Sequence, residues 1–121
     1  MPYIGTDIIE IARIEKVINR WGEGFLNRVY TDSELMICRQ KPSSLAARFA
    51  GKEAVIKALG TPNTGISFRE IEILSGPSRQ PLVRLHGKAQ NRADSLGLNS
   101  LAVSLSHSRE YAIALVVGET K

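Results

Sequence analysis

The spacing of apolar side chains divides the start of the chain into a strand and a helix. Residues 3–9 form a short run rich in β-branched side chains, typical of a strand, and Gly5 within it marks a bend or a close approach. From Ile11 to Trp21 apolar residues recur every three or four positions, the period of an amphipathic helix. We therefore expect a strand followed by an N-terminal amphipathic helix.

Two shorter helical segments follow. Residues 24–30 form the first, and Thr31 with Glu34 three positions later makes a capping box that opens the second. That helix is predicted to continue to about Arg39 and to be closed by Pro42.

A long alanine-rich helix is predicted over residues 44–59. Ser43 or Ser44 can cap its start, and Gly60 can end it. Gly51 lies in its interior, where glycine costs about 1 kcal/mol relative to alanine. Gly51 therefore either weakens the helix or allows another backbone or a ligand to come close.

The second half of the chain alternates between loop, strand and turn signals and contains one polar helix. A loop at 61–65 is followed by two strands, a helix and two more strands, predicted at residues 68–74, 82–86, 88–96, 101–105 and 111–117. Antiparallel hairpins combined with helices indicate the α+β class. We expect one antiparallel sheet packed against the long central helix and the N-terminal helix, in a single domain over residues 1–121.

Composition and charge narrow the classes of function. Sixteen Lys and Arg against twelve Asp and Glu give a net charge of +4, which favours an anionic partner such as a phosphate ester, an acidic protein or nucleic acid. Cys38 is the one cysteine, which excludes an internal disulfide and indicates a buried thiol in a reducing compartment. No secretory signal or membrane-spanning apolar run is seen, so we expect a soluble cytoplasmic protein without membrane contacts.

Charged residues of the long helix are the first candidates for chemistry. Phe49, Glu53 and Lys57 fall on one face, and Glu53 with Lys57 alone predicts an exposed ion pair worth about 0.3–0.5 kcal/mol. Asp7 alters this interpretation, because an acid in an apolar strand is costly to bury without a cation or hydrogen bonds. Asp7 and Glu53 can supply two carboxylates for Mg²⁺, and Lys57 can bind a phosphate oxygen. The alternative for Asp7 is a capping or surface position.

His107 is a further candidate, since it ends an alternating strand beside a turn that contains Ser106 and other polar residues. A lone histidine is more often structural, and His86 is interpreted in that way. We expect His107 and Asp7 to converge on the helix face that carries Glu53.

Three motifs together resemble the holo-[acyl-carrier-protein] synthases, the short type of 4'-phosphopantetheinyl transferase. They are GTDI at residues 5–8, RFAGKEAVIKALG at 48–60 and LSHSREYAIA at 105–114, and the resemblance covers the whole chain in order. Members of this family transfer the 4'-phosphopantetheine group of coenzyme A to a serine of apo acyl carrier protein. They release adenosine 3',5'-bisphosphate, use Mg²⁺ on the pyrophosphate, and support fatty-acid biosynthesis.

The resemblance also implies roles for individual residues. Asp7 and Glu53 resemble the metal ligands, Lys57 the lysine near the phosphates, and His107 the histidine near the coenzyme A pyrophosphate. Further implied contacts to coenzyme A are Arg48, Phe49 and Ser106. Larger relatives of the surfactin-synthetase type carry another metal-binding acid where this chain has Ile9, so water is expected to fill that part of the coordination shell. The base that deprotonates the serine stays open between Glu53 acting through water and an acid of the carrier protein.

The resemblance implies a homotrimer with active sites between subunits and an acidic protein partner. The basic residues expected to meet acyl carrier protein are Arg13, Lys16, Arg20 and Arg28. The alternative is a solvated basic face. Two other functions compete: the same transfer to carrier domains of polyketide or peptide synthases, and a small basic nucleic-acid-binding domain. Three Phe, three Tyr and one Trp, with no aromatic strand for stacking on bases, disfavour nucleic acid.

Overall fold

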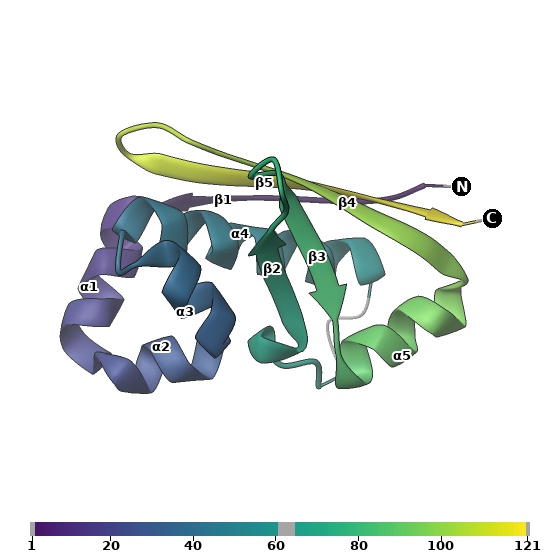
Figure 1. The fold of residues 1–121 in the computed structure, drawn as a ribbon, viewed down its shortest axis with the longest axis horizontal. Helices are drawn as coiled ribbons and strands as arrows, with labels where there is room; N and C mark the ends of the chain where they lie inside the picture. The colour runs from purple at the N-terminus through teal and green to yellow at the C-terminus, as the bar shows by residue number, and fades with distance from the viewer. Residues whose placement is uncertain (1, 61–64, 121) are drawn as a thin grey trace.

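A computed structural model describes residues 2–60 and 65–120, and the loop predicted at 61–65 falls outside that part except for its last residue. The fold is α+β, as expected (Figure 1). Its elements are β1 (Tyr3–Glu10), α1 (Ile11–Trp21), α2 (Glu23–Val29), α3 (Asp32–Cys38), α4 (Pro42–Leu59), the 3-10 helix η1 (Phe68–Glu70), β2 (Ile71–Ser75), β3 (Pro81–Leu85), α5 (Gly87–Leu96), β4 (Leu98–His107) and β5 (Tyr111–Thr120).

The described strands form two antiparallel sheets rather than the one expected. A three-stranded sheet in the order β1-β5-β4 makes one layer, and α4 runs along its inner side (Figure 1). The hairpin of β2 and β3 forms a second sheet, in which β2 packs against α4 and β3 reaches β4. Helices α1, α2 and α3 lie at one end of the molecule and α5 at the other.

Strand β1 crosses α4 at very short range because Gly5 has no side chain. A Cβ at this position would overlap the carbonyl oxygen of Ala54 and lie 2.9 Å from the backbone nitrogen of Ala58. The close approach predicted at Gly5 is confirmed. Because the crossing point lies only two residues before Asp7, it brings that carboxylate to the second half of α4.

The start of the long helix differs from the prediction. Pro42 occupies its first turn, Lys41 is the N-cap residue without a side-chain cap, and the expected serine cap is absent. Proline is favoured there because its missing N–H would have no partner within the helix. Helix α3 has already ended at Cys38, with Arg39 in the left-handed conformation. Pro42 therefore opens α4 rather than closing α3.

The boundaries of other elements also differ from the prediction. Residues Phe68–Glu70 form a 3-10 turn instead of the start of a strand, because Ser67 and Glu70 make a capping box that the apolar pattern concealed. Strands β4 and β5 are each ten residues long, since their pairing continues beyond the alternating segments to the bulge between Leu98 and Ser100.

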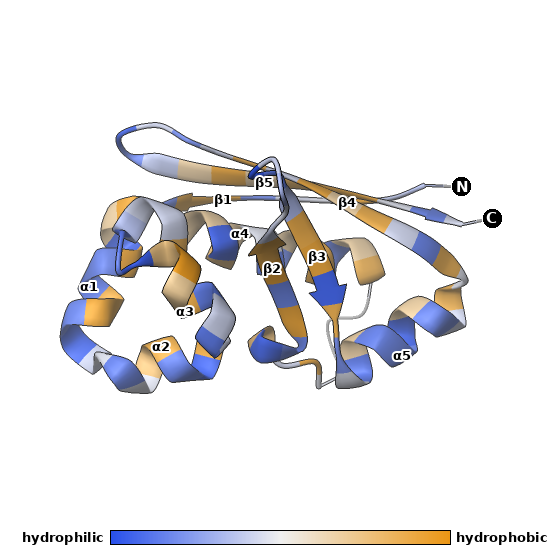
Figure 2. Cartoon of the chain, in the orientation of Figure 1, coloured by the Kyte–Doolittle hydropathy of each residue, from blue (hydrophilic) through white to orange (hydrophobic). Residues whose placement is uncertain are grey.

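One hydrophobic cluster lies between the inner face of the three-stranded sheet, α4, α5 and the β2–β3 hairpin, and a second lies between α1, α2, α3 and the first half of α4. Figure 2 shows largely hydrophobic β2 and β3 beside a mostly hydrophilic α5, the polar helix that was predicted. The thiol of Cys38 is fully buried, as expected. A Cβ at Gly51 would overlap Ile73 Cδ1 and lie 3.2 Å from Leu105 Cδ2. The close neighbours of Gly51 are therefore the side chains of Ile73 and Leu105 rather than another backbone.

None of the helices in the described part of the chain is both long enough and apolar enough to cross a membrane.

Candidate functional site

Strand β1 and the second half of α4 bring three charged side chains together. Lys57 Nζ donates to Asp7 Oδ1 at 3.0 Å and to the carbonyl oxygen of Thr6 at 3.0 Å. The Lys57 side chain is 54% exposed and that of Asp7 19%, so the cluster is open to solvent on one side. Glu53 lies one turn before Lys57. The ion-pair partner of Lys57 is thus Asp7 rather than Glu53.

The two carboxylates of this cluster repel each other. Burial raises the pKa of Glu53, the negative charge of Asp7 raises it further, and Lys57 opposes the change. Among residues 2–60 and 65–120, no group of three or more His, Cys, Asp and Glu side chains is placed to hold a metal. Two carboxylates and an open side fit Mg²⁺, which keeps several waters and commonly binds substrate phosphates as well.

A second group of predicted residues lies where the first half of α4 meets the end of β4. Arg48, Ser106 and His107 line a hollow of about 190 Å³ together with Ser43 and Ser44. The serines at the start of α4 were predicted as helix caps, and their place in this hollow was missed. Hydroxyl, imidazole and guanidinium groups around a small opening are suited to a phosphate or another polar anion.

Arg48 is held firmly at the edge of this hollow. Its side chain donates from Nε to the carbonyl oxygen of Ile73 at 3.0 Å and from Nη2 to Ser75 Oγ at 3.3 Å. The residue is only 8% exposed. A guanidinium has five N–H donors, so these two bonds leave others available.

A larger basic hollow adjoins the first and shares Ser44 with it. Its volume is about 750 Å³, and Arg39, Lys41 and Arg79 line it. The sequence contains a weak signal for it, the basic turn before α4, but Arg79 comes from the distant β2–β3 loop. Three cations around one opening create a positive potential suited to an anionic ligand.

The two groups of candidate residues lie on opposite sides of α4. Strands β1 and β4 are the outer strands of their sheet, so Asp7 and His107 belong to opposite edges. On the helix, Arg48 and Lys57 are nine residues apart, which at 3.6 residues per turn is about half a turn around the axis. The expected convergence of His107 with Asp7 and Glu53 on one helix face is therefore wrong for a single chain. Each side holds three of the seven residues predicted for catalysis and coenzyme A binding.

Phe49 belongs to neither half. Its ring stacks on Phe68 with a centroid distance of 5.2 Å and lies 6.3 Å from the ring of Phe25. It is partly buried in this aromatic cluster between α4, α2 and η1.

Basic and aromatic residues gather on α1 and α2. Trp21 is 62% exposed, and the Arg20 guanidinium carbon lies 5.2 Å from the centre of its ring. Val17, Trp21, Phe25 and Arg28 line an apolar pocket of about 350 Å³. The exposed basic residues of this surface are Arg13, Lys16, Arg20 and Arg28.

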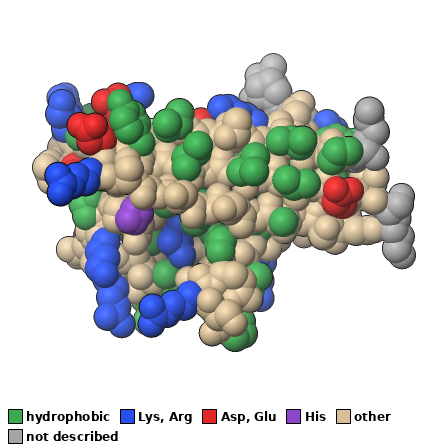
Figure 3. All heavy atoms as spheres, turned by 90° about the horizontal axis from the view of Figure 1, so that it is seen from above, with side chains coloured by type: hydrophobic (Ala, Val, Ile, Leu, Met, Phe, Trp, Pro, Cys, Tyr) green, Lys and Arg blue, Asp and Glu red, His purple; other side chains and the backbone are tan. Residues whose placement is uncertain are grey.

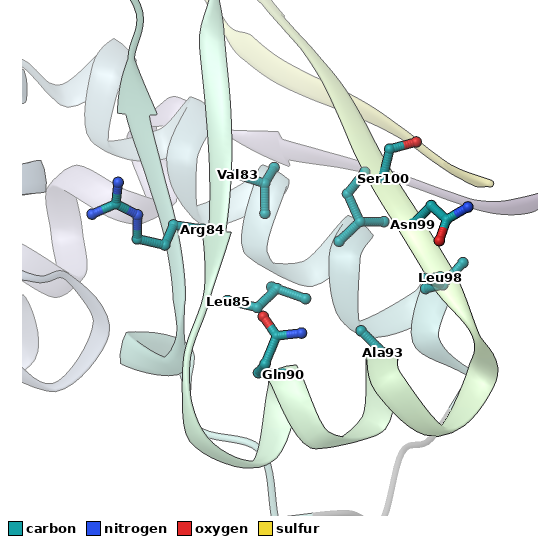
Figure 4. Close-up of a pocket in the computed structure, with 9 residues that line it drawn as sticks. Val83, Arg84, Leu85, Gln90, Ala93, Leu98, Asn99 and Ser100 are labelled. Atoms are coloured by element: carbon teal, nitrogen blue, oxygen red, sulfur yellow. The ribbon is translucent and has the colours of Figure 1, made fainter. Parts of the chain in front are cut away.

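Another hollow, of about 410 Å³, lies between β3, α5 and β4. Figure 4 shows Val83 and Leu85 pointing into it, whereas Arg84 points away. It contains none of the predicted site residues, and no charged groups converge in it.

Comparison with known proteins adds independent findings. The family model "4'-phosphopantetheinyl transferase superfamily" matches residues 3–116. A holo-[acyl-carrier-protein] synthase of Dehalococcoides mccartyi strain CBDB1 is 56% identical over 119 residues, covering 98% of this chain and 99% of the relative. The Helicobacter pylori synthase, solved in complex with coenzyme A, superposes with a TM-score of 0.87 at 41% identity, covering 96% of this chain and 99% of the other. The Neisseria meningitidis synthase superposes with a TM-score of 0.90 at 34% identity, covering 99% of this chain and 100% of the other.

Proposed function

Because the chain belongs to the 4'-phosphopantetheinyl transferase superfamily, we propose that its two groups of site residues are the halves of one coenzyme A site. The chain is a holo-[acyl-carrier-protein] synthase type of transferase, and it moves the 4'-phosphopantetheine group of coenzyme A to a serine hydroxyl of apo acyl carrier protein. The match over residues 3–116 supports one transferase domain. The observation that carries the site assignment is the meeting of Asp7, Glu53 and Lys57.

The proposed metal ion is Mg²⁺, with Asp7 and Glu53 as its protein ligands. The mutual repulsion of the two carboxylates supports this assignment, since a divalent cation would relieve it. When bound, the ion neutralises charge on the pyrophosphate. Lys57 lies on the open side of the cluster, where its ammonium could hold a phosphate oxygen.

The proposed contacts to the rest of coenzyme A are in the other half. Arg48, Ser106 and His107 surround the small hollow, and the larger basic hollow beside it suits the remaining phosphate of the nucleotide. Phe49 contributes by supporting the α4 surface next to Arg48 rather than by lining the hollow.

The proposed assembly is a homotrimer with active sites between subunits. The outer face of the three-stranded sheet exposes Ile4, Ile8, Ile113 and Leu115, each by 44–60%. Figure 3 shows this face, with hydrophobic side chains spread along it and charges concentrated toward one end. Several large apolar side chains exposed on one face are typical of an interaction surface. A ring of copies also joins unlike patches of neighbouring subunits, which would unite the two half-sites.

The proposed docking surface for acyl carrier protein is formed by α1 and α2. Acyl carrier proteins are strongly acidic, so the exposed Arg13, Lys16, Arg20 and Arg28 are complementary in charge. The apolar pocket beside Trp21 can receive a hydrophobic side chain of the carrier. Carrier domains of polyketide or peptide synthases present the same serine and are the alternative acceptors. The proposed compartment is the cytoplasm, supported by the buried free thiol of Cys38.

The test is transfer in a defined mixture of the protein, apo acyl carrier protein, coenzyme A and Mg²⁺. Mass spectrometry should show the carrier gaining one phosphopantetheine group, and EDTA should abolish the gain. Asp7→Asn and Glu53→Gln should each lose about 100-fold or more in turnover while staying folded. Asp94→Asn, which changes an exposed acid on α5, is the matched control and should retain normal turnover. Normal turnover in Asp7→Asn or Glu53→Gln would remove that residue from the metal site.

A further inference from the structure

A buried ion pair lies in the core beside the site. Lys52 on α4 and Glu34 on α3 have fully buried side chains, and Lys52 Nζ lies 2.7 Å from Glu34 Oε1. Lys52 also donates to the carbonyl oxygens of Phe68 and Ile71. An ammonium has three donors, so all of them are used within the protein.

The carboxylate of Glu34 is equally well satisfied. Its Oε1 accepts the backbone N–H of Thr31 at 2.9 Å, which is half of the capping box that opens α3. Its Oε2 accepts the backbone N–H of Ile73 at 2.8 Å. The pair therefore joins α3, α4, η1 and β2 at one point, and no buried side-chain nitrogen or oxygen of the described residues is left without a partner.

Stability alone does not account for this pair. Removing two charges from water offsets most of their attraction, and replacing a buried pair by apolar residues is often neutral or stabilising. What the ion pair supplies, and apolar side chains would not, is a fixed geometry. Five of the other ten buried residues of α4 are alanines, whose small side chains define the rotation of a helix weakly. An ammonium with three fixed acceptors allows one rotation only.

The pair is connected to both half-sites. Ile73 donates its N–H to Glu34 and accepts a hydrogen bond from Arg48 Nε on its carbonyl oxygen. Arg48 precedes Lys52 by one helical turn, and Glu53 follows it directly. A rotation of α4 that broke the ion pair would withdraw Arg48 from its hollow and turn Glu53 away from Asp7.

We propose that Glu34 and Lys52 are positioning residues that lock the rotation of α4 on β2, and thereby aim Arg48 and Glu53 at their half-sites. They act through this geometry, without touching coenzyme A or the metal ion. The inference rests on the roles proposed above for Arg48 and Glu53.

The main test is the double variant Glu34→Gln/Lys52→Met, which removes both charges, roughly conserves volume and retains an acceptor for the backbone N–H of Ile73. It should unfold cooperatively. Its affinity for Mn²⁺ in the absence of substrates, measured by isothermal titration calorimetry, should fall about 10-fold or more. A loss of this size is typical when a residue that supports a metal ligand is removed. The KM for coenzyme A should rise as well, because Arg48 is displaced.

Two further variants make the test decisive. Glu34→Asp keeps both charges but shortens the acidic side chain by one methylene, so this variant should fold and still bind Mn²⁺ more weakly than wild type. If the double variant does not fold, Glu34→Asp tests the proposal in its place. Asp94→Asn is the matched control, because Asp94 is exposed on α5 and its carboxylate accepts a hydrogen bond from Gln90 of the same helix. It should keep wild-type affinity for Mn²⁺.

Wild-type Mn²⁺ affinity and KM for coenzyme A in a folded Glu34→Gln/Lys52→Met variant, or in Glu34→Asp, would overturn the proposal. Glu53→Gln, titrated in parallel, separates this failure from failure of the metal site. If Glu53→Gln alone loses Mn²⁺ affinity, the site stands and only the positioning role is refuted. If Glu53→Gln also binds Mn²⁺ normally, both assignments fall.

Discussion

Replacing Gly5 with alanine should separate β1 from α4 and disturb the site at a distance. The added Cβ would lie 2.9 Å from the backbone nitrogen of Ala58, whereas ordinary contact begins at 3.4 Å. Restoring that contact requires a shift of at least 0.5 Å, and the overlap with the carbonyl oxygen of Ala54 requires more. The obstructing atoms belong to the backbone of a helix, so they cannot rotate away.

The expected magnitude follows from measured costs of overpacking, about 1–3 kcal/mol. For a chain of 121 residues the entropy of unfolding is about 0.25 kcal/mol/K, so Tm should fall by about 4–12 °C. Asp7 moves with the strand, and the Mg²⁺ concentration that gives half-maximal transfer should rise about 10-fold.

Gly24→Ala is the matched control, because Gly24 lies in α2 with nothing within 4 Å of an added Cβ. Alanine there should stabilise the protein by about 0.4–1 kcal/mol through its effect on the unfolded chain. Thermal unfolding followed by circular dichroism compares the two variants. If Gly5→Ala proves as stable as Gly24→Ala, with an unchanged Mg²⁺ requirement, the close crossing of β1 and α4 does not position Asp7.

Three other predictions concern separate parts of the molecule. Hydrogen bonds from the backbone N–H of Ser67, and then from that of Lys88, lower the pKa of Glu70. The stability that Glu70 adds to the fold is therefore fully present above its pKa in the unfolded chain, and it is lost as pH falls through its pKa in the folded protein. Glu70→Gln should cost about 1 kcal/mol at pH 7 in denaturant unfolding, and the difference from wild type should shrink as pH falls below the unfolded pKa of Glu70; a constant difference would contradict the assignment. Leu115→Arg on the sheet face should give monomers by light scattering and lose transfer; an intact trimer would remove this face from the interface. Arg28→Glu should raise the KM for the carrier at low salt and leave that for coenzyme A unchanged; equal changes in both would contradict a docking role.

Local signals in the sequence identified the elements whose boundaries depend on neighbouring residues. The capping box of Thr31 and Glu34 opens α3 as predicted, and the helical period from Ile11 ends at Trp21. The close approach at Gly5 was also correct, since a glycine inside a strand is typical of a point where another backbone comes near. Where two local signals competed, as at Pro42, the position of proline in the first turn of the following helix decided the boundary.

Local sequence signals do not predict which distant strands or side chains pair with each other. The order β1-β5-β4 puts the strands of Asp7 and His107 at opposite edges of the sheet, and no pattern within either strand specifies that order. The Glu34–Lys52 pair was hidden for another reason. Lys and Glu are almost never fully buried, so each is assigned to the surface unless its partner is known.

The motif at residues 48–60 looks like one site in the sequence, yet its polar residues have three different sets of neighbours. Arg48 turns to the hollow with His107, Lys52 enters the core, and Glu53 with Lys57 faces Asp7. A helix that serves two half-sites and one buried anchor must hold a single rotation, because turning toward one partner moves it away from another. This requirement accounts for a charged pair in the core of so small a protein. The proposed sharing of the site between copies of the chain rests on the same geometry, since Arg48 and Lys57 lie about half a turn apart around the helix axis.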